Sequence, residues 1–322
     1  MEHRQYVFDL FYAFVSVSYT SLLKNAFLFR EARRAVALLF LLALPTFRAV
    51  AQQPAPSGLS ASPDLFGKVL ANQKKAEALL DQYERVQRTE KRRSGGDADP
   101  LTITCYRLFP AGPAVDKLEL SSNGKPTAAY RTDLEKLEKY LMWAMQDGSP
   151  QKEAYAKAER KRKERFDLMD ATHQAFLFTL GGKELRAGRT LLRYSMAPNP
   201  AYRPTTRNTV VFTRVRGTVW IDEQSSELAK IQGTVTEDIS IALFLAKVYK
   251  GSQFMQERYE VAPGVWEPTF EQYDFDGRKY MLPFSIHERT FYSDYQRVGP
   301  PKEAVEVVRA ELSKPAADPP KE

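Results

Sequence analysis

The second half of this chain is a series of extended segments separated by short turns. Aromatic and β-branched residues, which pack well on a pleated sheet, dominate these segments, and the whole chain contains 16 Tyr, 19 Phe and 3 Trp. Short turns favour an antiparallel meander, because parallel strands need long crossover connections. We predict six strands, over 189–196, 209–221, 228–236, 252–261, 265–273 and 279–292.

Three other segments in this half have a less regular pattern. Asp276-Gly277 is a favoured two-residue hairpin signal. Gly181-Gly182 lacks the preceding strand and the spacing of a phosphate-binding loop, so we interpret it as a turn. Residues 239–249 are apolar and are expected to be helical or irregular. They form either ordinary core or a plug or lid over the sheet.

The first half is mainly helical. Apolar residues recur at spacings of three, four and seven over 65–88, as in an amphipathic helix. Further helices are expected over 131–146 and 151–177, and a strand pair over 101–109 and 115–120. Helices together with an antiparallel meander predict an α+β fold with a large, curved antiparallel sheet.

Residues 31–51 have the pattern of a secretory signal peptide. Arg33 and Arg34 precede an uncharged apolar run over 35–44, and Ala49-Val50-Ala51 offers a small-x-small cleavage site. The apolar run is shorter than the about 20 residues of a membrane span. We therefore predict export by a cleavable signal peptide, with an uncleaved membrane anchor as the alternative.

This signal peptide sets the other expected boundaries. Residues 1–30 are either a start assigned too early or an extra membrane segment. Residues 52–63 are rich in Pro, Ala and Ser and form a flexible leader, and 314–322 form a disordered tail. The range 64–313 is expected to be a single domain with a charged helical middle over 131–177.

Charge and cysteine content exclude several classes of protein. Beyond residue 51 the chain has 41 basic and 37 acidic residues, a weak positive balance spread along its length, so no nucleic-acid partner is expected. We interpret the basic stretch 157–165 as a solvated helix face, with a membrane-surface patch as the alternative. Cys105 is the only cysteine, so an exported chain depends on its apolar core and not on intrachain disulfides.

Motifs of known catalytic chemistry are missing from the sequence. It contains no His-Glu-x-x-His, no Cys-x-x-Cys and no Gly-x-Ser-x-Gly. Cys105 lies in an alternating strand, where a cysteine is usually a small buried hydrophobe. Glu267, Glu271 and Asp274 could supply a glycosidase-like acid/base pair, but alternating polar residues that face solvent explain them equally well. We predict no enzymatic activity, no cofactor and no metal site.

Four short segments of the second half form a recognisable set. They are 216–222 (Arg-Gly-Thr-Val-Trp-Ile-Asp), 228–231 (Leu-Ala-Lys-Ile), 266–268 (Trp-Glu-Pro) and 292–295 (Tyr-Ser-Asp-Tyr). In these segments the chain resembles the outer-membrane lipoprotein-sorting superfamily, which includes the LolA and LolB carriers and the MucB and RseB regulators. The resemblance extends over about 188–297. The charged helices over 131–177 have no counterpart in the carriers, and the lipobox cysteine of the outer-membrane receptor is missing.

The resemblance implies an unclosed antiparallel β-barrel wrapped around helices, in the periplasm of a two-membrane bacterium. In the carriers the apolar cavity holds lipoprotein acyl chains, and in the regulators a similar domain senses lipids and binds a membrane protein. Our first interpretation is therefore a periplasmic, non-enzymatic binding protein for lipoprotein acyl chains or another lipid. The second interpretation is an envelope-sensing module that binds a membrane protein. The candidate ligand-binding residues are Phe212, Trp220, Phe244, Leu245 and Trp266.

Overall fold

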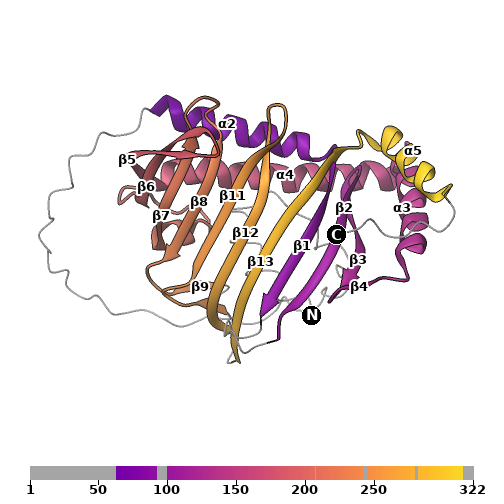
Figure 1. Ribbon diagram of the computed structural model, residues 1–322. Helices are drawn as coiled ribbons and strands as arrows, with labels where there is room; N and C mark the ends of the chain where they lie inside the picture. The colour runs from indigo at the N-terminus through magenta and orange to yellow at the C-terminus, as the bar shows by residue number, and fades with distance from the viewer. Residues whose placement is uncertain (1–62, 93–99, 207, 242–245, 280–281, 315–322) are drawn as a thin grey trace, which may run out of the picture.

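The computed structural model describes residues 63–92, 100–206, 208–241, 246–279 and 282–314 (Figure 1). Their helical elements are α2 (Pro63–Leu80), α3 (Tyr130–Ala144), α4 (Ser149–Ala175), the 3-10 helix η2 (Asn208–Arg214) and α5 (Pro301–Leu312).

The extended segments of the described chain fall into four groups in sequence order. The first group is β1 (Tyr83–Arg92), β2 (Thr102–Ala111), β3 (Ala114–Ser122) and β4 (Lys125–Pro126). The second group is β5 (Phe176–Arg186), β6 (Arg189–Pro198), β7 (Val215–Asp222) and β8 (Leu228–Val235). A short pair follows, β9 (Ile239–Ile241) and β10 (Ala246–Val248). The last group is β11 (Gln253–Ala262), β12 (Val265–Lys279) and β13 (Leu282–Arg297).

These strands form one 13-stranded sheet in which every described pair is antiparallel. The strand order is β4-β3-β2-β1-β13-β12-β11-β8-β7-β6-β5, and β10 attaches β9 to β12. Because β4 and β5 are the two ends of this order, the sheet is not closed within the described chain. The predicted α+β fold with an unclosed antiparallel barrel is confirmed.

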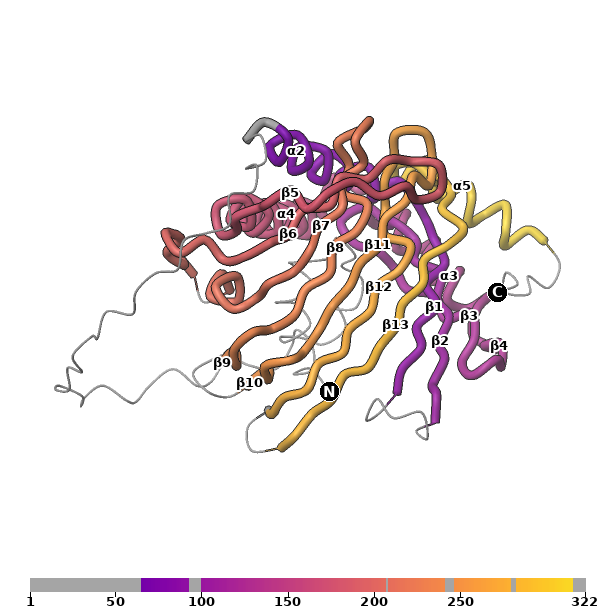
Figure 2. Tube along the Cα trace, turned by 60° about the vertical axis from the view of Figure 1, so that its left-hand side comes forward, coloured from indigo at the N-terminus to yellow at the C-terminus, as the bar shows by residue number. Residues whose placement is uncertain are grey.

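The sheet curves around α2 and α4, which run along one of its faces (Figures 1 and 2). Alternation along the strands sends one set of side chains to these helices. Phe254 of β11, Tyr273 of β12 and Val215 of β7 are buried there in the larger apolar cluster, together with Val69 of α2. Burial of this cluster against the helices fixes which face of each strand points inward.

A second apolar cluster lies at the β1–β3 end of the sheet. There α3 and α5 pack on each other and on β2. Leu137 of α3, Phe109 of β2 and Val305 of α5 are each at most 2% exposed. Cys105 is buried in this cluster as well, which confirms its interpretation as a small hydrophobe.

Several predicted boundaries are wrong, and each has a physical reason. The helix predicted over 65–88 ends at Leu80, because 83–92 form β1, which pairs with β2 and β13 far along the chain. The strand predicted from residue 209 begins at Val215, after η2. The elements β5 and α5 are additional to those predicted; β5 follows α4 directly, so its first residues fall within the range predicted as helix.

The turns predicted at Gly181-Gly182 and at Asp276-Gly277 are also wrong. Gly181-Gly182 is not a turn but a bulge within β5, where the register shifts between Leu180 and Gly182. Asp276-Gly277 is not the hairpin turn, since Gly277 pairs with Phe284 inside the β12–β13 ladder. A Cβ on Gly277 would lie 2.1 Å from the Lys247 carbonyl oxygen, so this glycine marks a close backbone approach instead.

The apolar segment 239–249 is not helical in its described part. Its ends form β9 and β10, and Ile239, Ala246 and Val248 are buried in the larger apolar cluster. Residues 242–245 lie outside the described residues.

Two paired glycines of β7 and β8 lie where a Cβ would have no room. Gly217 of β7 pairs with Gly233 of β8, and a Cβ on Gly233 would lie 2.5 Å from the Phe254 ring. A Cβ on Gly217 would lie 2.1 Å from the Gln232 carbonyl oxygen, which is backbone and cannot swing aside. The glycine in the segment 216–222 is therefore required by packing.

We expect Gly217→Ala to lower the free energy of unfolding by about 1–3 kcal/mol, the usual cost of overpacking. Gly67→Ala is the matched control, because a Cβ at this position in α2 meets nothing within 4 Å. It should raise stability by about 0.5–1 kcal/mol through helix propensity. Urea unfolding of both variants measures the difference, and equal effects would contradict the close approach seen at Gly217.

Candidate functional site

An apolar cavity of about 80 Å³ lies between the helices and the β5–β8 part of the sheet. Its walls come from α2, the end of α4, and strands β5 to β8. Most of the lining side chains are hydrocarbon or aromatic, and three are polar. They are Phe66, Val69, Leu70, Gln73, Thr172, His173, Phe176, Phe178, Met196, Val219, Ile221, Leu228 and Ile231.

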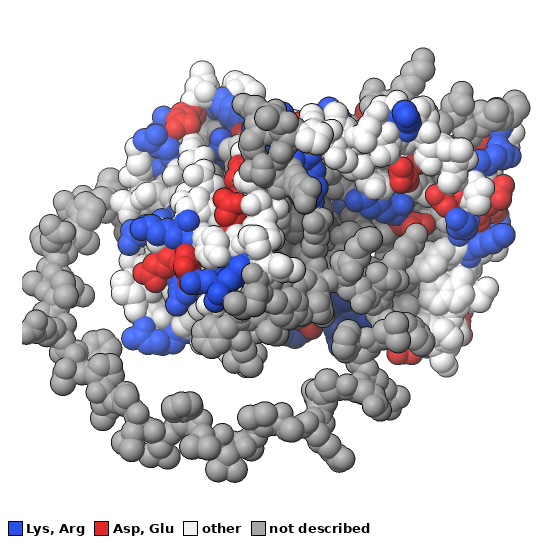
Figure 3. Space-filling model, turned by 90° about the horizontal axis from the view of Figure 1, so that it is seen from below, with Lys and Arg blue, Asp and Glu red and all other residues white. Residues whose placement is uncertain are grey.

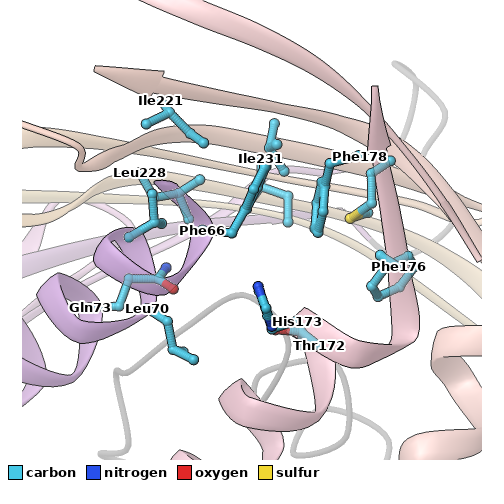
Figure 4. Close-up of a pocket in the computed structure, with 13 residues that line it drawn as sticks. Phe66, Leu70, Gln73, Thr172, His173, Phe176, Phe178, Ile221, Leu228 and Ile231 are labelled. Carbon is cyan, nitrogen blue, oxygen red and sulfur yellow. The ribbon is translucent and has the colours of Figure 1, made fainter. Parts of the chain in front are cut away.

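The polar groups of the cavity come from the helices (Figure 4). The side chains of Gln73 and His173 point into the space from α2 and α4, opposite the apolar side chains of the sheet. Thr172 donates its hydroxyl hydrogen to the Met169 carbonyl oxygen at 2.6 Å, so its hydrogen bond is satisfied locally. An apolar cavity with a few polar groups at one wall is typical of a small-molecule binding site.

Two aromatic side chains of the cavity lining stack on each other. The ring of Phe66 in α2 stacks on Phe178 in β5, with centroids 3.9 Å apart and planes at 20°. Tyr194 of β6 meets Phe66 edge-on at 5.3 Å. Phe66 and Phe178 are only partly buried. This contact therefore joins the first turns of α2 to the edge strand β5.

Polar contacts fix the rest of α2 to the neighbouring elements. The Asn72 amide donates to the carbonyl oxygens of Ser225 and Ser226 in the β7–β8 turn, at 3.1 and 3.2 Å. Three ion pairs join the last turns of α2 and the residue after it to α4. They are Lys74–Asp170, Glu77–Arg165 and Asp81–Arg162. All of these contacts are made from Asn72 onward, whereas Phe66, near the start of the helix, is held by ring stacking.

A belt of buried polar side chains crosses the inner face of the sheet beyond the apolar cavity. Gln256 donates to Glu271 Oε1 at 2.8 Å, and the Tyr292 hydroxyl donates to Glu271 Oε2 at 3.1 Å. Arg258 Nη2 lies 3.7 Å from Glu267 Oε2 and donates to the Trp266 carbonyl oxygen at 2.8 Å. Burial raises the pKa of Glu267 to about 7, although Arg258 acts in the opposite direction.

The alternative that these glutamates face solvent is wrong, since Glu267 and Glu271 are both fully buried. Asp274 alternates to the other face of the sheet, where its carboxylate lies 3.1 Å from His287 Nδ1. The three acids therefore do not meet in one site. Among the described residues, no three His, Cys, Asp or Glu side chains gather as metal ligands.

The predicted binding residues lie in different places. Phe212 of η2 is in the larger apolar cluster, 5.8 Å between centroids from Phe176, and stands behind the cavity wall. Trp220 and Trp266 belong to a separate small cluster with Leu191 and Ala229. Phe244 and Leu245 fall outside the described residues.

Both tryptophans face away from the cavity. Trp220 alternates with Val219 and Ile221, which line it, and its indole N–H donates to Glu184 Oε2 at 2.9 Å. Arg189, at the tip of the β5–β6 hairpin, lies 5.0 Å from the Trp266 ring. These rings thus hold the β5–β6 hairpin on the outer face of the sheet.

Several of the residues that line the cavity come from segments to which the sequence assigns no role. Phe66 and Leu70 lie in a helix predicted without a function, and β5 is absent from the predicted strands. The alternation of Phe176, Phe178 and Leu180 is the available signal for β5. It is easily missed because Phe176 follows the last residue of α4 directly.

Comparison with known proteins gives structural matches only. No protein-family model and no curated protein matches the chain. A domain from Vibrio parahaemolyticus described as a putative outer membrane lipoprotein-sorting protein is similar at 9% identity, with 76% of this chain and 99% of that chain covered and a TM-score of 0.30. A LolA superfamily protein from Nitrosomonas europaea is similar at 9% identity, with coverage of 77% and 97% and a TM-score of 0.26.

MucB, solved in complex with MucA(peri), is similar at 9% identity, with 71% of this chain and 93% of that chain covered and a TM-score of 0.20. The resemblance predicted from the sequence is thus met by structural matches to lipoprotein-sorting, LolA and MucB proteins, all at low identity. TM-scores this low assign neither ligand nor activity to this chain. None of the helices in the described ranges has the length and apolarity needed to cross a bilayer.

Proposed function

We propose that this chain is a non-enzymatic periplasmic binding protein that holds an apolar ligand, a lipoprotein acyl chain or another lipid, between α2 and the β5–β8 part of the sheet. The observation that carries the proposal is the apolar cavity beneath Phe66. Affinity comes from burial of methylene groups, each contributing about 0.8 kcal/mol. The periplasmic location rests on the signal-peptide pattern over 31–51.

Ligand entry requires the first turns of α2 to move. A cavity of about 80 Å³ is smaller than the roughly 150 Å³ apolar cavity that accepts one benzene molecule, so an acyl chain needs more room. The stacking of Phe66 on Phe178 is a single aromatic contact, of the kind that contributes about 0.5–1.5 kcal/mol beyond its buried area. Separation of these two rings opens the cavity at the β5 edge, while the ion pairs hold the other end of α2.

A neutral alkyl ligand tests this proposal directly. We expect 1-decanol and monodecanoylglycerol to bind the purified protein, and Phe178→Glu to weaken both at least tenfold, because a carboxylate among methylene groups is costly to desolvate. Isothermal titration calorimetry measures the affinity. The matched control is Leu185→Glu on the same β5–β6 hairpin, since Leu185 is 78% exposed and its replacement should leave affinity unchanged.

Absence of binding by both neutral ligands, with the wild-type protein folded, would contradict the proposal. That result would leave the envelope-sensing module that binds a membrane protein as the interpretation to pursue. Equal weakening by Phe178→Glu and Leu185→Glu would place the ligand elsewhere on the molecule.

A further inference from the structure

A second cavity, of about 90 Å³, lies further along the same two helices. The lining comes from the end of α2 with the residue after it, from α4, from Arg85 of β1 and from the β2–β3 turn. The helical part is 77, 80 and 81 and, in α4, 158, 161, 162 and 165. At the α2 end these positions continue the face that carries Phe66, Leu70 and Gln73 into the apolar cavity, at helical spacing. The two cavities therefore follow one another along α2 and α4.

The second cavity has an excess of basic side chains. Arg85, Lys161, Arg162 and Arg165 line it, against only two acidic side chains. Both acids are already engaged, since Glu77 pairs with Arg165 and Asp81 pairs with Arg162. Elsewhere, on the face seen in Figure 3, basic and acidic side chains lie side by side.

Arg85 is the group that sets this cavity apart. It is only 1% exposed, and an arginine side chain stays charged in proteins. Within the described chain no carboxylate oxygen lies within 4.0 Å of its guanidinium group, its Nε has no hydrogen-bond partner, and Nη1 makes one long contact of 3.5 Å with the Tyr83 carbonyl oxygen. The carboxyl groups of Asp81 and Glu267 interact with Arg85 electrostatically from farther away. A buried charge normally has a partner of opposite charge in direct contact, because desolvation is otherwise too costly.

We propose that this cavity binds an oxyanion of the phosphate class, with Arg85 as its buried ligand and Lys161 and Arg162 at its mouth. Arginine matches phosphate because its planar group offers several N–H donors in a fixed geometry. The side chain of Arg162 is 28% exposed, so the site is reachable from solvent. A water molecule needs about 10–15 Å³ of cavity volume. The volume of about 90 Å³ therefore has room for a group of several heavy atoms.

Two sources supply this chemistry. One is free inorganic phosphate, and the other is the phosphate headgroup of a lipid whose chain occupies the neighbouring apolar cavity. The anion site itself stands independently of the proposed function, and only the headgroup source rests on it.

The test compares inorganic phosphate, decyl phosphate and 1-decanol on the purified full chain. We expect both phosphates to bind the wild type and to bind Arg85→Met at least tenfold more weakly by calorimetry at constant ionic strength. Melting curves of both proteins without phosphate show whether Arg85→Met is folded, so loss of binding is separable from unfolding. The control is Arg160→Met, since Arg160 is exposed on α4 and does not line the cavity.

The outcomes separate the two proposals. Decyl phosphate that binds much more tightly than phosphate, and loses that advantage in Phe178→Glu, identifies the lipid headgroup. Equal affinities identify the free oxyanion. If phosphate binding depends on Arg85 and decanol does not bind, the proposed binding of an apolar ligand is contradicted and the anion site is supported. Identical phosphate and decyl phosphate affinities in the wild type and Arg85→Met would overturn the anion site, whatever decanol does.

Discussion

Replacing Arg107 by methionine is expected to lower the free energy of unfolding by about 3–5 kcal/mol, the usual effect of breaking a buried ion pair. Arg107 of β2 donates to Glu84 Oε2 of β1 at 2.6 Å and to Glu311 Oε2 of α5 at 2.6 Å. It also donates to the Tyr130 hydroxyl of α3 at 2.8 Å, and that hydroxyl donates to Glu311 Oε1 at 2.8 Å. One side chain thus joins two strands and two helices.

The loss of stability in Arg107→Met arises mainly at the carboxyl groups that lose their partner. Burial raises the pKa of Glu84, while Arg107 acts against this shift. Without Arg107, Glu84 either stays charged in a buried position or takes up a proton, and both outcomes cost free energy. Methionine keeps most of the side-chain length, so loss of packing on Phe109 contributes less than loss of charge compensation.

Urea unfolding measures this change, and the double variant Glu84→Gln/Arg107→Met should be less destabilised than the sum of the two single variants. The control is Lys136→Met in α3, whose partner Asp133 is also accessible, with side-chain exposures of 67% and 30%. Exposed pairs of this kind contribute at most about 1 kcal/mol. An Arg107→Met variant as stable as this control would contradict the central role of the network.

The second large expected effect is a fall in stability as pH rises, caused by Glu267. Burial raises the pKa of its carboxyl group from 4.5 to about 7 in the folded protein. The folded state therefore holds this proton more tightly than the unfolded state between these values. The stabilisation is fully present below about pH 4.5 and is lost as pH rises through about 7, a change of about 3 kcal/mol.

Urea unfolding at pH 5 and pH 8 should show this loss in the wild type, and Glu267→Gln should show a smaller one. Burial also raises the pKa of Glu227 to about 7 and raises the pKa values of Glu77, Asp81 and Glu84, so these carboxyl groups contribute to the remaining slope in the same direction. Glu153→Gln, at an exposed position of α4, is the control and should keep the wild-type dependence. A Glu267→Gln variant with the full wild-type slope would contradict this assignment.

Much of the sheet could be predicted because its signals are local. Strands β6, β8 and β11 to β13 alternate in polarity and end at turns, and α3 and α4 have clear helical periodicity with a Gly-Ser-Pro break between them. The strand β1 could not be predicted, because its residues are mostly charged and also fit the helical spacing of 65–88. It is a strand because β2 and β13 lie on either side of it.

The candidate site was predicted less well than the fold. The face of the sheet on which a side chain lies, and how deeply it is buried, are not local properties of the sequence. Trp220 and Trp266 are aromatic residues in strands, and nothing in their local sequence shows that they point away from the helices. One step of register exchanges the two faces of a strand. Conversely, Phe66 and Phe178 belong to a helix and a strand that are distant in the chain and meet only in the folded molecule.

Local patterns alone were enough to specify the class of structure, since strand and helix periodicity and short turns indicated an α+β chain with an antiparallel sheet. The positions of the buried charges, in contrast, depend on the folded arrangement. Arg85, Glu267 and Glu271 have the polar character of surface residues, yet curvature of the sheet around α2 and α4 buries all three. Periodicity follows from backbone geometry within a segment, whereas desolvation depends on which distant segments pack against it.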